Sequence, residues 1–227
     1  MLVKNWMSKK VVTIDARESM QNATALMKEH RIRMLPVLQR SKLVGIITDR
    51  DLKKASASDA TSLEIHELLY LLTKIKIEEI MTRDPITVDP QWTVEETAQL
   101  LLDKKISGVP VTVADRSVVG VITQTDIFRV LTSLTGIENG GVQVACLVED
   151  RPGSIKELAD LIRGYGGQMV SILSSYDQAS ENRRKVYIRM RHIERSRMGS
   201  LRKELVENFD VRYIIDHTQN QREIFSE

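Results

Sequence analysis

The chain has one cysteine, few aromatic residues and no long hydrophobic run. Among 227 residues, Cys146 is the only cysteine and 4% of residues are aromatic, so no internal disulfide can form. No run of about 18 uncharged apolar residues occurs, and residues 1–5 are not followed by the apolar core of a signal peptide. We therefore expect neither a disulfide framework nor a membrane span, and we expect the protein to reside in the cytoplasm.

The chain also lacks an excess of charge of either sign. The 33 Lys and Arg residues nearly balance 31 Asp and Glu residues, for a net charge of +2, so the overall field indicates neither a nucleic-acid nor a membrane partner. Cys146 lies in the alternating run 142–148, which is typical of a small buried side chain in a strand. The histidines have neither metal-ligand nor catalytic spacing, and they are His30, His66, His192 and His217. We expect no metal site.

An imperfect internal repeat spans residues 7–127. The matched segments are Met7–Ile14 with Met81–Val88, Ile32 with Ile106, Pro36–Val37 with Pro110–Val111, Gly45–Thr48 with Gly120–Thr123, and Asp51 with Asp126. Two related units that stack to complete one core would explain this order.

Each repeat predicts strand, helix, strand, strand, helix. The patterns are extended segments at 11–14 and 86–88, helical faces of Met20, Ala23 and Met27 and of Val94, Ala98 and Leu101, hairpin strands at 35–38, 43–47, 109–113 and 118–122, and helices opened by Asp51 and Asp126. Thr93 and Glu96 form a capping box. Between the copies, residues 55–62 predict a loop. A connecting helix follows, and its apolar face is expected to be Ile65, Leu68, Leu69 and Leu72. Such a face is more often buried in a core than exposed as a partner surface.

A glycine-rich break at 135–141 begins a further domain. The predicted elements are a strand at 142–148, a helix at 154–165, strands at 168–176 and 185–190, a helix at 197–208 and a strand at 211–217. This βαββαβ order is the ferredoxin-like arrangement. Ser154 with Glu157 predicts a capping box, and the buried face of the helix is expected to be Ile155, Leu158, Ala159 and Ile162. The polar end at 218–227 is expected to fray.

Both repeats place a threonine at a strand end and an aspartate three residues later, at a helix start. The pairs are Thr48 with Asp51 and Thr123 with Asp126. Helix N-termini favour phosphate, and a carboxylate can accept both ribose hydroxyls, so the motif suits a nucleotide. The alternative is that each aspartate only caps its helix. Two copies at matching positions favour the nucleotide.

These motifs, Met-Ser/Thr, Pro-Val and Gly-hydrophobic-hydrophobic-Thr-x-x-Asp, resemble those of the cystathionine-beta-synthase (CBS) domain, here as a tandem pair. The resemblance implies CBS domains at 1–60 and 77–136, joined by a linker helix at 61–76, with two clefts that bind AMP, ADP, ATP or a related adenosyl ligand. The residues implied for the first cleft are Thr13, Arg33, Met34, Pro36, Thr48, Arg50 and Asp51. Those implied for the second are Thr87, Gly108, Val109, Pro110, Thr123 and Asp126.

The first cleft has the better electrostatics for phosphate. Arg33 and Arg50 can pair with phosphate oxygens, whereas the matching positions are Ser107 and Thr125. A phosphorylated ligand is therefore expected to prefer the first cleft. The alternative is that both arginines only serve the solvated surface.

After a linker at 137–141, residues 142–227 resemble the ACT domain, a module that often binds amino acids at a dimer interface. The corresponding turn holds Asp150, Arg151, Pro152 and Gly153, although Pro152 and Gly153 could serve only to shape it. Met169 and Val170 stand where many members have a polar Asn-Ile pair. The combination of domains is similar to acetoin-utilization AcuB-type proteins, which implies an α+β regulatory protein that pairs as a homodimer.

The sequence thus predicts a non-catalytic sensor of adenine nucleotides, without a cofactor, acting on an enzyme that the sequence does not identify. A catalytic constellation and a phosphate-binding loop of the Gly-x-x-x-x-Gly-Lys type are both missing. One alternative is a purely structural oligomerisation module. Another is nucleic-acid binding through a cluster of basic residues. Glu181 and Glu194 reduce the positive charge of this cluster, so a solvated edge strand is the favoured interpretation. The basic residues are Arg183, Arg184, Lys185, Arg189, Arg191, Arg195 and Arg197.

Overall fold

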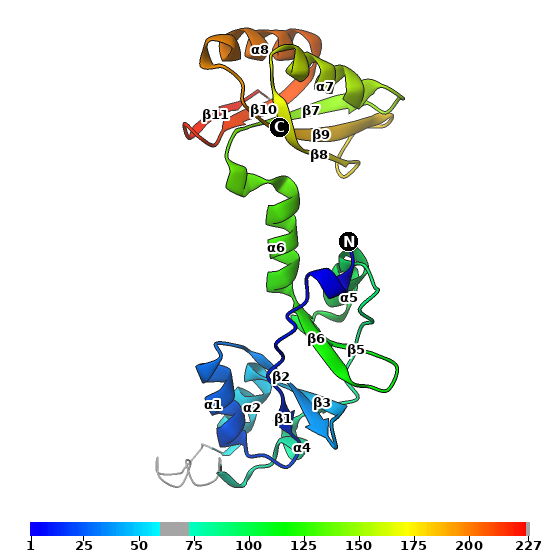
Figure 1. Cartoon of the computed structure of the whole chain (residues 1–227), viewed down its shortest axis with the longest axis vertical. Coiled ribbons are helices and arrows are strands. Elements are labelled where there is room, and N and C mark those ends of the chain that lie inside the picture. Colours follow the sequence, from blue (N-terminus) through cyan, green and yellow to red (C-terminus); the bar gives the residue numbers. More distant parts are fainter. Residues whose placement is uncertain (60–72, 226–227) are drawn as a thin grey trace. The chain divides into compact units, whose positions relative to one another are not determined.

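The structure is a computed structural model that describes residues 1–59 and 73–225. The chain divides into two compact units, residues 1–128 and 129–227, which both combine helices with strands (Figure 1). The expected α+β class is confirmed. Outside the described residues lie His66 and the predicted apolar face of Ile65, Leu68, Leu69 and Leu72.

The N-terminal unit contains both repeats. Its elements are η1 (Val3–Asn5), β1 (Ile14–Asp15), α1 (Met20–Glu29), β2 (Met34–Gln39), β3 (Lys42–Thr48), α2 (Asp49–Asp59), α4 (Ile77–Ile80), β4 (Thr82–Arg83), α5 (Val94–Lys104), β5 (Gly108–Thr112), β6 (Val118–Thr123) and the first turns of α6 (Gln124–Thr135). The predicted hairpins are β2–β3 and β5–β6, each with a register shift after its matching valine, Val37 or Val111. Ile14 pairs in parallel with Val37, and Val88 does so with Val111, so the repeats share one backbone plan.

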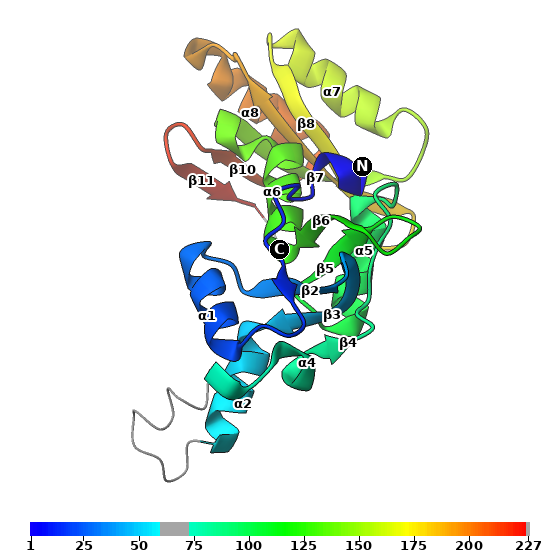
Figure 2. The same ribbon diagram turned by 60° about the horizontal axis from the view of Figure 1, so that its bottom comes forward.

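The helices of the first repeat pack on its hairpin. The predicted face of α1, Met20, Ala23 and Met27, is buried, and α1 lies beside α2 (Figure 2). In the second repeat, the predicted capping box of α5 is confirmed, because Thr93 Oγ1 accepts from Glu96 N at 3.1 Å and Glu96 Oε2 accepts from Thr93 N at 2.8 Å. Local sequence signals therefore set these helices.

The loop predicted at 55–62 is wrong over its first five residues, because α2 continues to Asp59. Leu52 is buried in the core of the first repeat, with Ala55 packed against that core. Ser56 donates its hydroxyl to the Leu52 carbonyl at 3.0 Å, so this serine is satisfied inside the helix. Tertiary packing overrides the loop-like composition here.

The two repeats exchange their leading segments. Before the first repeat, Val3 donates to the Trp92 carbonyl at 2.9 Å, and Ser8 exchanges two backbone hydrogen bonds with Val121 of β6. Before the second, β4 pairs with β3, and Ile77 donates to the Glu18 carbonyl at 3.0 Å. Each hairpin thus has its outer edge covered by chain that leads into the other repeat, so the pair forms one folding unit.

The C-terminal unit follows a short 3-10 turn, η2 (Ile137–Asn139). Its elements are β7 (Val142–Glu149), α7 (Ser154–Gly164), β8 (Gln168–Ser175), β9 (Arg183–Arg191), α8 (Arg195–Asn208), β10 (Asp210–Asp216) and β11 (Gln221–Ile224). The sheet has the order β11-β10-β7-β9-β8 and is antiparallel throughout. The predicted βαββαβ order is therefore present, with one added strand.

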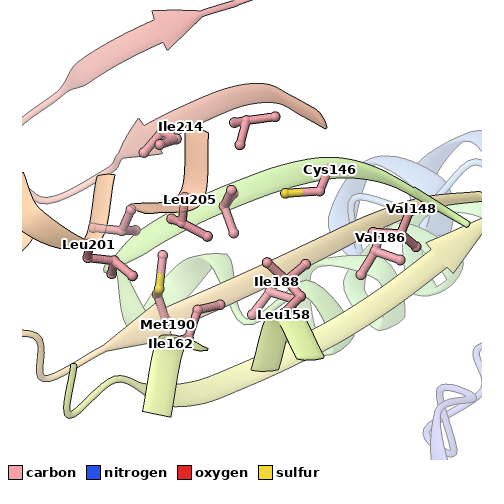
Figure 3. Packing of buried hydrophobic residues seen from close by; sticks show 13 residues of the cluster. Cys146, Val148, Leu158, Ile162, Val186, Ile188, Met190, Leu201, Leu205 and Ile214 are labelled. Atoms are coloured by element: carbon pink, nitrogen blue, oxygen red, sulfur yellow. The ribbon is translucent and has the colours of Figure 1, made fainter. Parts of the chain in front are cut away.

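Both helices of this unit cover one face of the sheet (Figure 1). In Figure 3, Leu158 and Ile162 of α7 and Leu201 and Leu205 of α8 converge on the strand residues. Cys146 belongs to this core, 1% exposed, as its alternating run predicted.

Two local predictions for this unit are wrong. The polar end does not fray from Thr218, because Gln221–Ile224 forms β11 on the edge of β10. Backbone pairing needs no apolar side chains, and Arg202 adds an ion pair to Glu223. The Ser154–Glu157 capping box does not form either, because Gly153, at φ 94°, is the N-cap and Arg151 holds Glu157 by two hydrogen bonds of 2.8 Å.

The solvated edge strand proposed for Arg189 is also wrong. Strand β9 lies between β7 and β8, and Arg189 is 2% exposed. Its guanidinium donates to the carbonyls of Thr135, at 2.7 Å, and Gly140, at 3.0 Å. These carbonyls include the C-terminal end of α6, where a cation is favoured. Burial lowers the pKa of Arg189, and the hydrogen bonds offset that desolvation.

Candidate functional site

The two threonine–aspartate pairs have the same geometry in both repeats. Asp51 Oδ2 accepts from Thr48 N at 2.9 Å and from Thr48 Oγ1 at 2.6 Å. Asp126 Oδ2 accepts from Thr123 N at 2.9 Å and from Thr123 Oγ1 at 2.7 Å. Each aspartate sits in the first turn, so the expectation that Asp51 and Asp126 open their helices is corrected: α2 begins at Asp49 and α6 at Gln124.

This arrangement is a reciprocal helix cap. It fixes the rotamer of each aspartate, and it commits one carboxylate oxygen and the threonine hydroxyl proton. Among the described residues, Oδ1 of Asp51 makes no hydrogen bond, and the side chain is only partly buried. A preorganised carboxylate with a remaining acceptor can receive hydroxyl donors. Capping and ligand binding are therefore compatible functions of Asp51.

The start of each hairpin lies beside its threonine–aspartate pair. Met34 is opposite Thr48 in the β2–β3 ladder, and Gly108 is opposite Thr123 in β5–β6. The carbonyl of the preceding residue accepts from the helix start, Arg33 from Asp49 N at 3.0 Å and Ser107 from Gln124 N at 2.9 Å. These two backbone links carry no sequence signal, because any residue supplies a carbonyl.

The remaining predicted residues of the two repeats lie farther along the same hairpins. Pro36 and Pro110 are buried within β2 and β5, two positions beyond Met34 and Gly108, and Val109 is buried between Gly108 and Pro110. Thr13 and Thr87 are half-buried and directly precede Ile14 and Val88, which pair with the hairpins. Thus each predicted set gathers around one hairpin.

Arg33 and Arg50 flank the first pair and are exposed. Among the described residues neither has an ion-pair partner. Ser107 and Thr125, exposed at the matching positions of the second repeat, carry no charge. The charge difference predicted between the two repeats is thus presented to solvent.

The predicted turn of the C-terminal unit is held by its own side chains. Arg151 is bound by Glu157 and, through Nε, by Glu149 at 2.9 Å. The hydrogen bonds to Glu157 and Glu149 raise the pKa of Arg151, and the hydrogen bond from Arg151 lowers the pKa of Glu157. Each side chain therefore stabilises the charged form of the other. Asp150 accepts from Tyr176 Oη at 3.3 Å, and Pro152 is exposed. A ligand carboxylate would have to compete with Glu157 for this arginine.

The basic residues of β9 and α8 do not form one free patch. Arg183 pairs with Asp210 at 3.0 Å, and Arg184 lies 3.5 Å from Asp150. Arg189 is buried, and Arg197 donates to the Gly164 carbonyl at 2.9 Å. Four of the seven basic residues thus serve contacts within the C-terminal unit.

Residues 1–59 and 73–225 contain no helix with the length and apolar character needed to span a membrane. The same part of the chain has no group of three or more His, Cys, Asp or Glu side chains that could hold a metal ion.

Comparison with known proteins identifies the repeats. The CBS domain profile matches residues 3–58 and 77–133. A CBS domain-containing protein of Dictyostelium discoideum is 32% identical over 131 residues, which are 57% of this chain and 90% of that protein. L-aspartate semialdehyde sulfurtransferase of Methanocaldococcus jannaschii is 38% identical over 129 residues, 56% of this chain and 23% of the enzyme. The chain spans about a quarter of such enzymes, and the matches lie in their CBS part.

Solved structures agree with this assignment. The CBS domain pair of protein MJ0100, in complex with 5′-methylthioadenosine and S-adenosyl-L-methionine, is 37% identical, with a TM-score of 0.50 over 58% of this chain and 95% of that one. A putative acetoin utilization protein (AcuB) from Vibrio cholerae is 26% identical, with a TM-score of 0.51 over 61% of this chain and 96% of that one. With its two matched copies, this chain belongs to the CBS domain family.

Proposed function

We propose that this chain is a non-catalytic sensor that binds an adenosine ligand, AMP, ADP, ATP or an adenosyl compound, at the two threonine–aspartate pairs. The observation that carries the proposal is the matching pair of hydrogen bonds that holds Asp51 and Asp126 in two repeats that otherwise differ, with Asp51 partly buried and Asp126 4% exposed. The adenosine compounds bound by the similar MJ0100 pair support the ligand class. In each site the aspartate would receive ribose hydroxyls, and the helix start would face phosphate or carboxylate.

Calorimetry on the full chain with AMP, ADP, ATP, 5′-methylthioadenosine and S-adenosyl-L-methionine tests this function. Asp51→Asn and Asp126→Asn should each weaken binding at their own site at least about tenfold, because a carboxylate accepts more strongly than an amide. Thr93→Ala is the matched control, since it removes the capping box of α5 at a cost of about 1 kcal/mol without touching either site. Absence of binding to all five compounds would refute the sensor.

We further propose that α6 relays occupancy. This helix is continuous from Gln124 to Thr135, its first turn contains Asp126, and its last carbonyl accepts from Arg189 of the C-terminal sheet. A ligand that binds one arrangement of the first turn better than another would bias that helix, by no more than its difference in affinity.

The C-terminal unit is proposed as an ACT-type effector or dimerisation domain. Its βαββαβ order supports this, and Asp150, Arg151, Pro152 and Gly153 form the proposed effector turn. An amino-acid effector would displace Glu157 from Arg151. Glu157→Gln should therefore strengthen effector binding if the turn is a site, and leave calorimetric titrations with amino acids flat if it is only a turn.

A further inference from the structure

A second candidate site lies in the C-terminal unit, at the end of the sheet away from the effector turn. It is a pocket of about 570 Å³ bounded by the first residue of β7, the ends of β9 and β10, β11 and the first turns of α8. The effector turn follows the opposite end of β7. This volume is in the range that takes small organic ligands.

Part of the pocket wall is apolar. Val142, Met190 and Ile214 lie behind this part, in the buried core (Figure 3 labels the last two), and the partly buried Ile193 presents apolar surface to the pocket. Met198, which is partly buried, adds a flexible side chain. Met side chains adapt to irregular apolar partners. This wall favours a ligand with an apolar body.

The rim has three arginines and two carboxylates, Asp216 and Glu223. Among its charged groups, Arg202 pairs with Glu223, and Asp216 accepts from the amides of Thr218 and Gln219. Arg195 has no ion-pair or hydrogen-bond partner in the described chain. Arg191 has only a contact of 3.4 Å to Gln168.

The start of α8 reinforces this charge. Arg195 opens the helix after the N-cap Glu194, whose carboxylate accepts no hydrogen bond from the first turn, and the first turn itself contains no acidic residue. The amides of this turn are therefore left for an anion, which the guanidinium of Arg195 would also attract.

We propose that this pocket binds a small organic anion, with an apolar body against Ile193 and Met198 and a carboxylate or phosphate between Arg191 and Arg195. Arginine suits either anion, because its guanidinium binds both in a bidentate manner. The site goes beyond nucleotide sensing and does not depend on it.

The test is an NMR titration of the full ¹⁵N-labelled chain with octanoate, octyl phosphate and neutral octanol. Octanoate or octyl phosphate should shift the amides of Gly141, Met190 and Met198, and whichever binds more tightly identifies the anion. Octanol should bind at least about tenfold more weakly, because it lacks the charge.

The variant Arg191→Ala/Arg195→Ala should weaken anion binding at least about tenfold, and both side chains are exposed, so the fold should persist. Arg163→Ala, an exposed arginine of α7 paired with Asp160, is the control and should change affinity less than about twofold. Unchanged affinity in the double variant, equal binding of octanol, or shifts confined to other residues would overturn the proposal. Nucleotide titrations of this variant should match the wild type, which separates this failure from failure of the sensor.

Discussion

The charge of two side chains distinguishes the two proposed nucleotide sites. Arg33 and Arg50 are exposed beside the first threonine–aspartate pair, where the second repeat has Ser107 and Thr125. We predict that Arg33→Ala/Arg50→Ala weakens ATP binding at the first site at least about tenfold, since two charge-assisted contacts are lost. Calorimetry provides the measurement, with Ser107→Ala/Thr125→Ala as the matched control. Equal affinity in both double variants would contradict the assigned preference.

Cys146 gives a second prediction at this scale. Burial, with a smaller effect of Asp210, raises the pKa of the Cys146 thiol from 9.0 to about 12. The folded state therefore keeps its proton where the unfolded state loses it, so this contribution to stability is full below pH 9 and is lost as the pH approaches about 12. The free energy of unfolding should fall over that window by up to about 1.4 kcal/mol per pH unit.

Urea unfolding at several pH values, compared between wild type and Cys146→Ala, isolates this thiol from the tyrosines that also titrate there. A thiol reagent at about pH 8 should label Cys146 only after unfolding, because the reactive form is the thiolate. Labelling of the native protein at the rate of a free thiol would show that the side chain is not buried in solution.

At the scale of elements, the exchanged segments depend on two glycines. A Cβ at Gly45 of β3 would clash with Met81 Sδ and lie 3.0 Å from the Thr82 carbonyl, whereas the three atoms nearest to a Cβ at Gly120 of β6 all belong to the Met7 side chain. A methionine side chain can move and a paired strand cannot. We predict that Gly45→Ala costs about 1–3 kcal/mol, and that Gly120→Ala costs less.

Chemical unfolding of both variants measures this difference. Combining Gly45→Ala with Met81→Ala should recover part of the loss, as a double-mutant cycle would detect. If Gly45→Ala and Gly120→Ala lowered the free energy of unfolding equally, the backbone of β4 would move aside as readily as the Met7 side chain, which would contradict the prediction.

Local patterns predicted much of each element but not its long-range partners. The hairpins and the Thr93 cap follow from residues near one another in sequence, and they are present. The pairing of β4 with β3 involves two residues, too short for a periodic signal. Arg189 was misplaced because the acceptors that make its burial tolerable, Thr135 and Gly140, lie about 50 positions away.

The candidate sites show the same limit. The threonine–aspartate spacing could be read from the sequence because both partners lie within one turn. The alternative drawn from the sequence, that each aspartate caps its helix, is present in the structure as a reciprocal bond between the two side chains. The anion pocket was not predicted at all, since its wall is assembled from η2, β7, β9, β10 and α8.

At the scale of the whole molecule, β8 leaves an edge suited to pairing. It is one of the two outer strands of the C-terminal sheet, spans eight residues without charge or proline, and exposes Ile172. Its one register shift lies near its start, between Met169 and Ser171, and leaves the segment around Ile172 regular. Edge strands that stay single usually carry charge, proline or a strong irregularity. We predict a homodimer joined through β8.

Light scattering should therefore give twice the 25.9 kDa of one chain. Ile172→Lys should weaken the dimer at least about tenfold by placing like charges across the twofold axis. Ile224→Lys, an exposed residue of β11 at the opposite edge, should not. A wild-type monomer at all concentrations, or dissociation by the β11 variant instead, would refute this assignment.

The crossed leading segments also bear on how the protein is made. During translation the first hairpin emerges from the ribosome before Thr82 and Arg83, which cover its edge. The second hairpin can be covered as soon as it emerges, because its partner Ser8 is already synthesised. The nascent chain therefore passes through an interval in which one strand edge is open to a chaperone or to a neighbouring polypeptide. A gene cut between the repeats would make that interval permanent, unless both fragments were produced together.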